Sequence, residues 1–447
     1  MLNQAEDFIG NFKKLDIITC SYSNSNITQV SFIQDKFEIY ITGLTNQIHI
    51  EQIKYNPKVI LQFGDNEANL KYQGIAKIVK ITESKERKLK KLTKADSVSQ
   101  EGIFGPVLVK IIPTEIEVKK WDFVHRFLEN KPKTIKEVFR SIGTTIKIWL
   151  RATRLSFVAV SVTGVFVGTA VAFSETGSLN SWLNFLLAAI GISFFHIAVD
   201  LLNDFSDHRS GLDESNIHLT PFSGGSRMIQ SKLFTPAKVL LGAIFSLAIC
   251  LSIGLYLNFT VDGNVILYIG LGGAFLGIFY VGAPLKLVYY GLGELAIFVS
   301  FGPAIVFGSY YLQKEVFSWE PILASILIGL LIFLILYINQ FPDYEADKAN
   351  KKFNWVVLLG KKKARHIYAF FMALTYILLI VFSILNFLPL LSLTVLITLP
   401  LPIVAIITAY KHYDNYLAMI PASAMTILTT LTFSIILGIS LFVAPLL

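Results

Sequence analysis

Long apolar segments recur from residue 148 to the C-terminus, and they constrain the fold of this chain more than any other feature of its sequence. A helix that crosses a bilayer needs about 20 mostly apolar residues, and about nine segments reach that length. The pattern therefore predicts an all-α multi-pass membrane bundle of about nine transmembrane helices. The predicted segments are 150–173, 181–202, 237–257, 264–281, 291–311, 321–341, 365–387, 389–409 and 418–444.

The composition agrees with a membrane protein. Hydrophobic residues make up 53% of the 447 residues and charged residues only 16%, whereas soluble domains carry about 25% charged residues. These figures exclude an entirely soluble enzyme. We attribute the net charge of +8 to basic cytosolic loops and expect no nucleic-acid partner. Cys20 and Cys250 lie far apart and define neither a disulfide framework nor a zinc site.

Basic residues occur in alternate loops, which predicts the orientation in the membrane. The loops after the second, fourth, sixth and eighth segments contain Arg209, Arg227, Lys232, Lys286, Lys348, Lys351, Lys352, Lys361, Lys362, Lys363, Arg365 and Lys411. The opposite loops offer Lys314, so the positive-inside rule places the basic loops in the cytosol. Residues 1–16 lack the apolar region of a signal peptide. We therefore expect a multi-pass protein of the cell (inner) membrane with a cytoplasmic N-terminal domain.

The first 125 residues follow another pattern. Short runs alternate apolar and polar residues between Asn, Asp, Gly and Pro, as half-buried strands do. The predicted strands are Ile17–Tyr22, Gln29–Ile33, Phe37–Thr42, Lys58–Phe63, Lys71–Val79 and Val107–Ile112, and the predicted helices are Gln47–Tyr55 and Ser84–Thr93. The runs predict a small soluble β-barrel or α+β domain over 1–125, a linker or interfacial helix over 126–146 and the transmembrane domain over 147–447.

The order of these runs, with Asn56-Pro57 after the first helix and Ile112-Pro113 near the end, resembles the pyridoxamine 5′-phosphate oxidase-like split barrel. The resemblance implies an FMN-binding domain that forms a homodimer. Family members usually present Lys or Arg to the FMN phosphate eight residues before the proline of the Asn-Pro turn, and that position holds His49. Two interpretations stay open: a barrel with His49 at the flavin phosphate, or a barrel that serves structure, dimerisation or another ligand.

Two acidic motifs lie where predicted spans reach the cytosol. Spacings of three and four residues place Asp204 with Asp207, and Asp343 with Asp347, on one helix face each. Carboxylates that converge on a partly dehydrated cavity repel one another without a cation, and Mg²⁺ bridges carboxylates to substrate phosphates. The spacing therefore predicts Asp204, Asp207, Asp343 and Asp347 as metal ligands. The predicted diphosphate-binding cations are Arg154, Arg227, Lys348, Lys351 and Lys352.

These motifs resemble the two aspartate-rich motifs of the UbiA superfamily of intramembrane prenyltransferases. The segments Pro221–Arg227, Gly291–Glu294 and Phe341–Lys348 are more narrowly similar to the 1,4-dihydroxy-2-naphthoate prenyltransferase branch. Two positions depart from the family pattern. Arg154-Leu155 stands where the superfamily has Arg-Pro, and Asn350-Lys351-Lys352-Phe353 stands where it has Gly-Lys-Arg-Thr.

The resemblance implies Mg²⁺-dependent transfer of an isoprenyl group from an allylic polyprenyl diphosphate to an aromatic quinone precursor, such as 1,4-dihydroxy-2-naphthoate in a menaquinone-type pathway. It makes Asp204, Asp207, Asp343 and Asp347 the catalytic aspartates that hold the metal. It adds Asn203, through its amide oxygen, and Asp213, through a bound water, as further metal ligands. Tyr280 and Tyr344 would face the allylic cation or the acceptor through cation–π contacts. Anchoring at the membrane interface is the alternative role for both tyrosines.

Two other functions remain open at this point. A secondary transporter also carries acids in its membrane helices, but it predicts inverted repeats and broken helices near the midplane. A membrane-tethered flavin oxidoreductase would act through the N-terminal barrel beside a degenerate membrane domain. The acidic pairs on one side of the membrane, each followed by cations, favour diphosphate chemistry over both.

Overall fold

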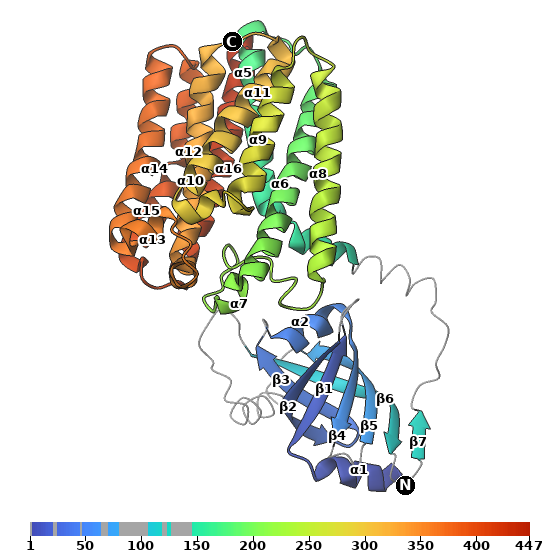
Figure 1. Cartoon of the computed structure of the whole chain (residues 1–447). Helices are drawn as coiled ribbons and strands as arrows, with labels where there is room; N and C mark the ends of the chain where they lie inside the picture. The colour runs from blue at the N-terminus through green and yellow to red at the C-terminus, as the bar shows by residue number, and fades with distance from the viewer. Residues whose placement is uncertain are drawn as a thin grey trace. The chain divides into compact units, whose positions relative to one another are not determined.

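The computed structural model describes residues 2–20, 25–44, 47–63, 70–79, 106–118, 123–126 and 145–447. They form two compact units (Figure 1). The first contains Met1–Ala152 and Arg227–Pro236, and the second contains Thr153–Ser226 and Ala237–Leu447. The predicted helix Ser84–Thr93 and most of the predicted linker 126–146 lie outside the described residues.

The first unit is built on an antiparallel barrel. Its elements are α1 (Leu2–Gly10), β1 (Lys14–Cys20), β2 (Ser25–Asp35), β3 (Glu38–Leu44), α2 (Ile48–Tyr55), β4 (Lys58–Phe63), β5 (Leu70–Val79), β6 (Pro106–Val118) and β7 (Phe123–Arg126). The strands follow the order β3-β2-β1-β4-β5-β6-β7, and β3 also pairs with β6. That additional pairing closes β1 to β6 on themselves (Figure 1). The predicted soluble β-barrel is confirmed.

Alternating burial explains the barrel register. In β4, Val59, Leu61 and Phe63 are buried while the residues between them are more exposed, because successive side chains of a strand point to opposite faces. The pairing of β5 with β6 shifts between Gln73 and Gly74. A Cβ at Gly74 would lie 2.8 Å from the carbonyl oxygen of Ile112, so this irregularity needs a residue without a side chain.

The second unit is a bundle of long helices (Figure 1). Its elements are α5 (Leu155–Thr176), α6 (Trp182–Ser210), α7 (Leu212–Ser215), α8 (Pro236–Asn258), α9 (Val265–Val281), η2 (Leu287–Tyr290), α10 (Gly293–Val299), the π-helical turn η3 (Ser300–Ala304), α11 (Ile305–Lys314), α12 (Trp319–Ala349), α13 (Trp355–Leu359), α14 (Lys361–Ile384), η4 (Leu390–Thr398), α15 (Pro400–His412), α16 (Ile420–Val443) and η5 (Ala444–Leu446). The helix α8 begins at the last residue of the first unit.

The number of spans is close to the predicted nine. Within the described residues, seven helices are long and apolar enough to cross a membrane, or up to eight if the bent pair η4–α15 is one span. The helix α9 is a shorter apolar helix. Each predicted segment thus corresponds to a helix or a helix pair, and the count of nine is approximate.

The helix α12 lies at the centre of the bundle. The fraction of buried residues in its apolar window is 78%, compared with 17% for α8. Small residues allow the central helices to approach closely, as is common in membrane bundles. A Cβ at Gly302 would lie 2.7 Å from the Cα of Gly329. The second acidic motif is therefore carried by the most enclosed helix of the unit.

Candidate active site

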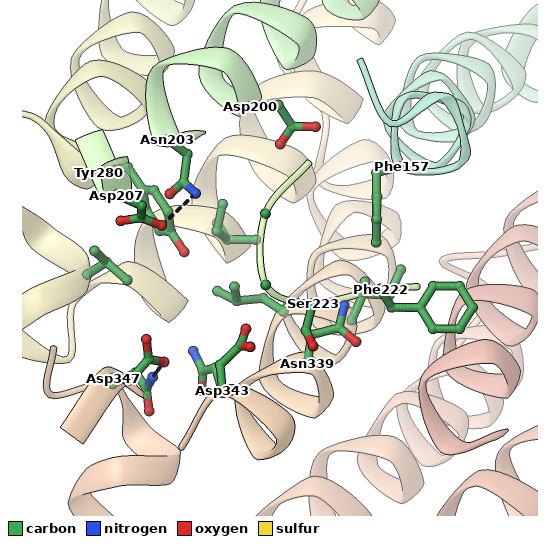
Figure 2. A pocket seen from close by; sticks show the side chains of 18 of the residues that line it. Phe157, Asp200, Asn203, Asp207, Phe222, Ser223, Tyr280, Asn339, Asp343 and Asp347 are labelled. Atoms are coloured by element: carbon green, nitrogen blue, oxygen red, sulfur yellow. Dashed lines mark hydrogen bonds between the residues drawn. The ribbon is translucent and has the colours of Figure 1, made fainter. Parts of the chain in front are cut away.

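A cavity of about 190 Å³ in the membrane unit is lined by residues of both acidic motifs (Figure 2). The acids come from the C-terminal parts of α6 and α12 and from α7, and cations come from the segments before α5 and after α12. The polar residues that line it are Arg154, His196, Asp200, Asn203, Asp207, Asp213, Asn216, Ser223, Tyr280, Asn339, Gln340, Asp343, Asp347, Lys352 and Asn354.

Arg154 neutralises the first aspartate of α6. Its Nη2 donates to Asp204 Oδ1 at 2.6 Å, and the hydroxyl of Ser226 donates to Asp204 Oδ2. Burial alone would lower the pKa of Arg154, but Asp204 and the other nearby carboxylates outweigh that effect and hold the pKa above its usual value. Arg154 therefore stays charged, and Asp204 is already paired.

Lys352 lies between the two motifs. Its Nζ is 3.6 Å from Asp207 Oδ2 and 3.8 Å from Asp347 Oδ1. Burial alone would lower the pKa of Lys352, but the two carboxylates outweigh burial and hold the pKa well above its usual value. Lys352 is therefore a permanent cation shared by aspartates of two helices, and it explains how two buried acids tolerate each other's proximity.

Amide side chains fix the orientation of three aspartates. Asn203 donates to Asp207 Oδ2 at 3.0 Å, a contact drawn in Figure 2. Asn354 donates to Asp347 Oδ2 at 2.7 Å. Asn216, in the segment after α7, donates to Asp343 Oδ1 at 2.8 Å. Each of the three carboxylates thus accepts a hydrogen bond from a neutral amide group, whether or not a cation also lies beside it.

Two consecutive glycines bring the segment after α7 against Asp213. Gly224 and Gly225 have φ angles of 80° and 75°, a region that only glycine adopts readily. A Cβ at Gly225 would lie 2.9 Å from Asp213 Oδ1. The Gly-Gly pair of the predicted motif 221–227 is therefore explained by a tight backbone turn around a carboxylate that lines the cavity.

Glu294 holds the segment that carries Lys352. It is fully buried, and its Oε1 accepts from Gln340 Nε2 at 2.9 Å and from the backbone N–H of Trp355 at 2.7 Å. One carboxylate oxygen thereby joins α10 and α12 to the start of α13. Lys352 and Asn354 lie immediately before this attachment, so Glu294 restricts where their side chains can reach.

The donor set fits Mg²⁺. The cavity offers carboxylate oxygens, which are the ligands that this ion prefers, and Asp207 Oδ1 is buried without a hydrogen-bond partner in the described part of the chain. No group of three or more His, Cys, Asp or Glu residues among those described is placed to hold an ion alone. An ion bound here would complete its shell with water and substrate phosphate.

Most of the predicted site residues come together at this cavity. Asn203, Asp207, Asp213, Asp343, Asp347, Arg154, Lys352 and Tyr280 line it, and Asp204 lies directly behind Arg154. Sequence reasoning missed Asn216, Ser226 and Asn354, because no spacing pattern links them to the aspartates that they contact.

Other predicted residues lie elsewhere. Lys348 is exposed and stands over the ring of Tyr344 at 5.6 Å, and neither is among the residues that line the cavity. Lys351 is also exposed. Arg227 is grouped with the first unit, and His49 is a buried residue of α2 in that unit.

The cavity has one charged end and one apolar end. Along α12, Ile332 and Ile335 precede Asp343 by two to three helical turns, and all three line the cavity. Phe157, Phe222 and Phe301 also contribute to the lining. Such a cavity can hold a molecule with an anionic head and a hydrocarbon body.

The family model described as the UbiA prenyltransferase family matches residues 161–429. The chain is 33% identical over 220 residues to a 2-carboxy-1,4-naphthoquinone phytyltransferase of Synechocystis, covering 49% of this chain and 68% of the relative. It is 30% identical over 239 residues to a 1,4-dihydroxy-2-naphthoate octaprenyltransferase of Mycobacterium tuberculosis, covering 52% of this chain and 78% of the relative.

Solved structures resemble each part of the chain. A UbiA homolog from Aeropyrum pernix aligns with a TM-score of 0.51 and 16% identity over 64% of this chain and 97% of that chain, and it shares the fold. A protein described as a pyridoxamine 5′-phosphate oxidase from Listeria innocua aligns with a TM-score of 0.24 and 19% identity over 26% of this chain and 97% of that chain.

Proposed function

Because this chain belongs to the UbiA prenyltransferase family, we propose that its cavity is where an isoprenyl group passes from an allylic polyprenyl diphosphate to a naphthoate acceptor, in menaquinone-type quinone synthesis. Two relatives are named for prenylation of naphthoate or naphthoquinone rings. The observation that carries the proposal is the single cavity lined by aspartates of both motifs, by two buried cations and by an apolar wall.

The charged end binds the diphosphate. Lys352, held between Asp207 and Asp347, donates to the outer phosphate oxygens, and Arg154 contributes a second positive charge. Asp207, Asp343 and Asp347 would hold Mg²⁺, which neutralises the diphosphate oxygens when it is bound. The bond between the allylic carbon and the bridging oxygen then breaks, and the diphosphate leaves with the bonding electron pair.

The apolar end shields the allylic cation from water until a ring carbon of the acceptor attacks it. That carbon then releases its substituent, a proton or the carboxylate as CO₂, and the ring regains its aromaticity. Phe157, Phe301 and Ile332 line this part of the cavity. Tyr280 also lines the cavity, and an aromatic face next to a desolvated cation contributes about 2 kcal/mol. The proposed pocket therefore contains Tyr280 and not Tyr344, whose ring stands under the ammonium groups of Lys348 and Lys361.

The orientation of the protein in the membrane is also part of the proposal. The basic residues that follow α12 lie in the same loop as Lys352, and Arg154 lies immediately before α5. The positive-inside rule then places the charged end of the cavity and the N-terminal barrel on the cytoplasmic side of the inner membrane.

The role of the barrel is separate from the transfer step. His49 is 4% exposed, and a Cβ at Gly43 would lie 2.8 Å from its Nε2. An imidazole enclosed in this way does not face an external phosphate, so the described residues do not fit FMN at this position. We derive no step through a flavin, and a homodimer through the barrel stays a proposal.

The decisive experiment is an assay of purified protein in lipid with Mg²⁺, a radiolabelled allylic diphosphate and 1,4-dihydroxy-2-naphthoate. We expect a labelled naphthoquinone lipid from the wild type, and a rate reduced about 100-fold or more for Asp347→Asn, because the substitution removes a carboxylate charge at the diphosphate.

If the assay detects no transfer, a separate measurement of diphosphate binding shows which part of the proposal has failed. Mg²⁺-dependent binding without transfer would keep the prenyltransferase and reject the naphthoate acceptor. A wild type that binds no diphosphate would refute the proposed role of the cavity. Ser193→Ala is the matched control, because the Ser193 hydroxyl bonds only to the backbone of its own helix, at Ala189.

A further inference from the structure

A second polar cluster lines the cavity beyond the aspartates assigned to the diphosphate. His196 and Asp200 belong to α6 and both line the cavity. Asp200 precedes Asp204 by one helical turn, about 6 Å along the axis, and His196 precedes it by two. Ionisable side chains inside a membrane helix are costly and usually serve binding or transport. The proposed transfer, as described above, uses neither of them.

The imidazole is held by three elements. The Ser161 hydroxyl of α5 and Nδ1 of His196 share a hydrogen bond at 2.5 Å. His196 Nε2 lies 3.5 Å from Asp200 Oδ2. The ring meets Phe301 of η3 edge to face, with centroids 5.4 Å apart. His196 is thus fixed by its neighbours and directs one ring nitrogen toward Asp200.

Asp200 has unused capacity to accept a hydrogen bond. Its side chain is 19% exposed. Oδ2 is buried and faces His196 Nε2 at 3.5 Å without a hydrogen bond in the described ranges. Arg154, the nearest cation of the site, donates to Asp204. Figure 2 shows Asp200 on the same wall as Asn203 and Asp207. Because the carboxylate of Asp200 is partly exposed and lines the cavity, a hydroxyl group of a ligand can donate a hydrogen bond to it.

The carboxylate of Asp200 favours the aromatic acceptor over the isoprenyl diphosphate as its ligand. The hydrocarbon tail of an isoprenyl diphosphate has no donor to offer, and its anionic head is bound at the charged end, beside Lys352. A hydroxylated aromatic ring offers both an O–H donor and an apolar face for Phe157 and Phe301, which line the same cavity. The short distance along α6 to Asp204 allows one ring to contact Asp200 and still reach the allylic carbon.

We infer that Asp200, positioned by His196 and Ser161, binds a ring hydroxyl of the aromatic acceptor. This inference rests on the proposed function and deepens it. It also fixes the orientation of the acceptor, because a carboxylate at Asp200 attracts the hydroxyl and repels the ring carboxylate. The carboxylate of the acceptor therefore points away from Asp200.

The test separates acceptor binding from donor binding. Asp200→Leu removes both acceptor oxygens at similar volume, and Asp200→Asn keeps one neutral acceptor. We expect the KM for 1,4-dihydroxy-2-naphthoate to rise about tenfold or more in the leucine variant and less in the asparagine variant. Mg²⁺-dependent binding of the allylic diphosphate should stay at the wild-type level in both, as in the Ser193→Ala control.

An acceptor analogue with one hydroxyl replaced by methoxy gives a second readout. The wild type should prefer the dihydroxy compound, and Asp200→Leu should lose this preference. His196→Gln should raise the acceptor KM less than Asp200→Leu does, with donor binding unchanged. The inference is overturned if Asp200→Leu keeps the preference or weakens donor binding equally. A wild type that binds donor but prenylates no naphthoate would instead refute the proposed function.

Discussion

Single residues at the charged end have two tasks, and Lys352 shows how they combine. Its ammonium group separates Asp207 from Asp347, and its pKa lies well above the usual value, so it remains a cation across the physiological range. In the free protein it limits repulsion between buried acids. In the proposed complex it meets the diphosphate. One side chain thus contributes to both stability and binding.

Replacing Lys352 tests both tasks. Lys352→Met should weaken diphosphate binding about tenfold or more, because the variant loses a buried charge partner. Mg²⁺ alone should raise the Tm of this variant more than that of the wild type, because two carboxylates then lack their cation. Calorimetric titration with an allylic diphosphate and thermal unfolding in lipid nanodiscs measure these effects.

The neighbouring Lys351 is the matched comparison. Its side chain is exposed, so Lys351→Met should weaken diphosphate binding less than Lys352→Met. Equal losses would show that the two lysines contribute alike, as the sequence motif on its own suggests.

The residues of the site were predictable where a local spacing marks them. Asp204 with Asp207 and Asp343 with Asp347 repeat within one helix each, so their shared face follows from helix geometry. Asn216 reaches Asp343 across 127 residues, and such a contact is created only by the packing of the bundle. Asp200 carries a weak local signal, since it lies one turn before Asp204.

At the scale of elements, the bundle depends on close approach between helices. Gly168 of α5 faces α11 so closely that a Cβ there would lie 2.1 Å from the carbonyl oxygen of Val306. The helix α5 carries Phe157 and Ser161 toward the site. Displacing α5 from α11 would therefore move one wall of the cavity.

Gly168→Ala should destabilise the protein by about 1–3 kcal/mol, the usual cost of overpacking a close contact. Gly254→Ala is the control, because a Cβ at Gly254 of α8 meets no atom within 4 Å and alanine favours helix by about 1 kcal/mol. Thermal unfolding in nanodiscs compares the two variants. A Gly168→Ala protein as stable as the control would contradict this account of the packing.

Helices and strands were predicted correctly where a single hydrophobic periodicity dominates the segment. The strand Lys58–Phe63 was predicted with the bounds that β4 has, because apolar residues alternate cleanly there. The segment 291–311 was predicted as one span, and the structure has one candidate span there, Gly293–Lys314, which contains the π-helical turn Ser300–Ala304. Hydropathy does not reveal such a turn, because the turn changes backbone hydrogen bonding and leaves the apolar character unchanged. The strand β7 and the helix α1 were missed, and both are peripheral to the barrel strands.

At the scale of the whole molecule, the chain divides its tasks between two units. The residues that line the cavity all belong to the second unit, from Arg154 to Asn354. The barrel has its own apolar core, which includes Ile17, Ile39 and Phe63. The geometry of the site therefore does not depend on any described side chain of the barrel.

A variant that begins at residue 145 should accordingly retain most of the transfer activity and bind the diphosphate as the full chain does. The assay of labelled naphthoquinone lipid measures the transfer activity, and calorimetric titration measures diphosphate binding. Loss of diphosphate binding in a variant that still elutes as a folded monodisperse species would contradict the separation of tasks. Loss of transfer with binding intact would instead give the barrel a part in the reaction.

The two ends of the cavity have a consequence for the direction of the reaction. The charged end releases an ion that water solvates, and the apolar end releases a prenylated ring that dissolves in the bilayer. After release, the products occupy different phases, and each is dilute where the other is soluble. Reversal would need both to meet again in one small chamber. Release of the two products into different phases therefore disfavours their recombination.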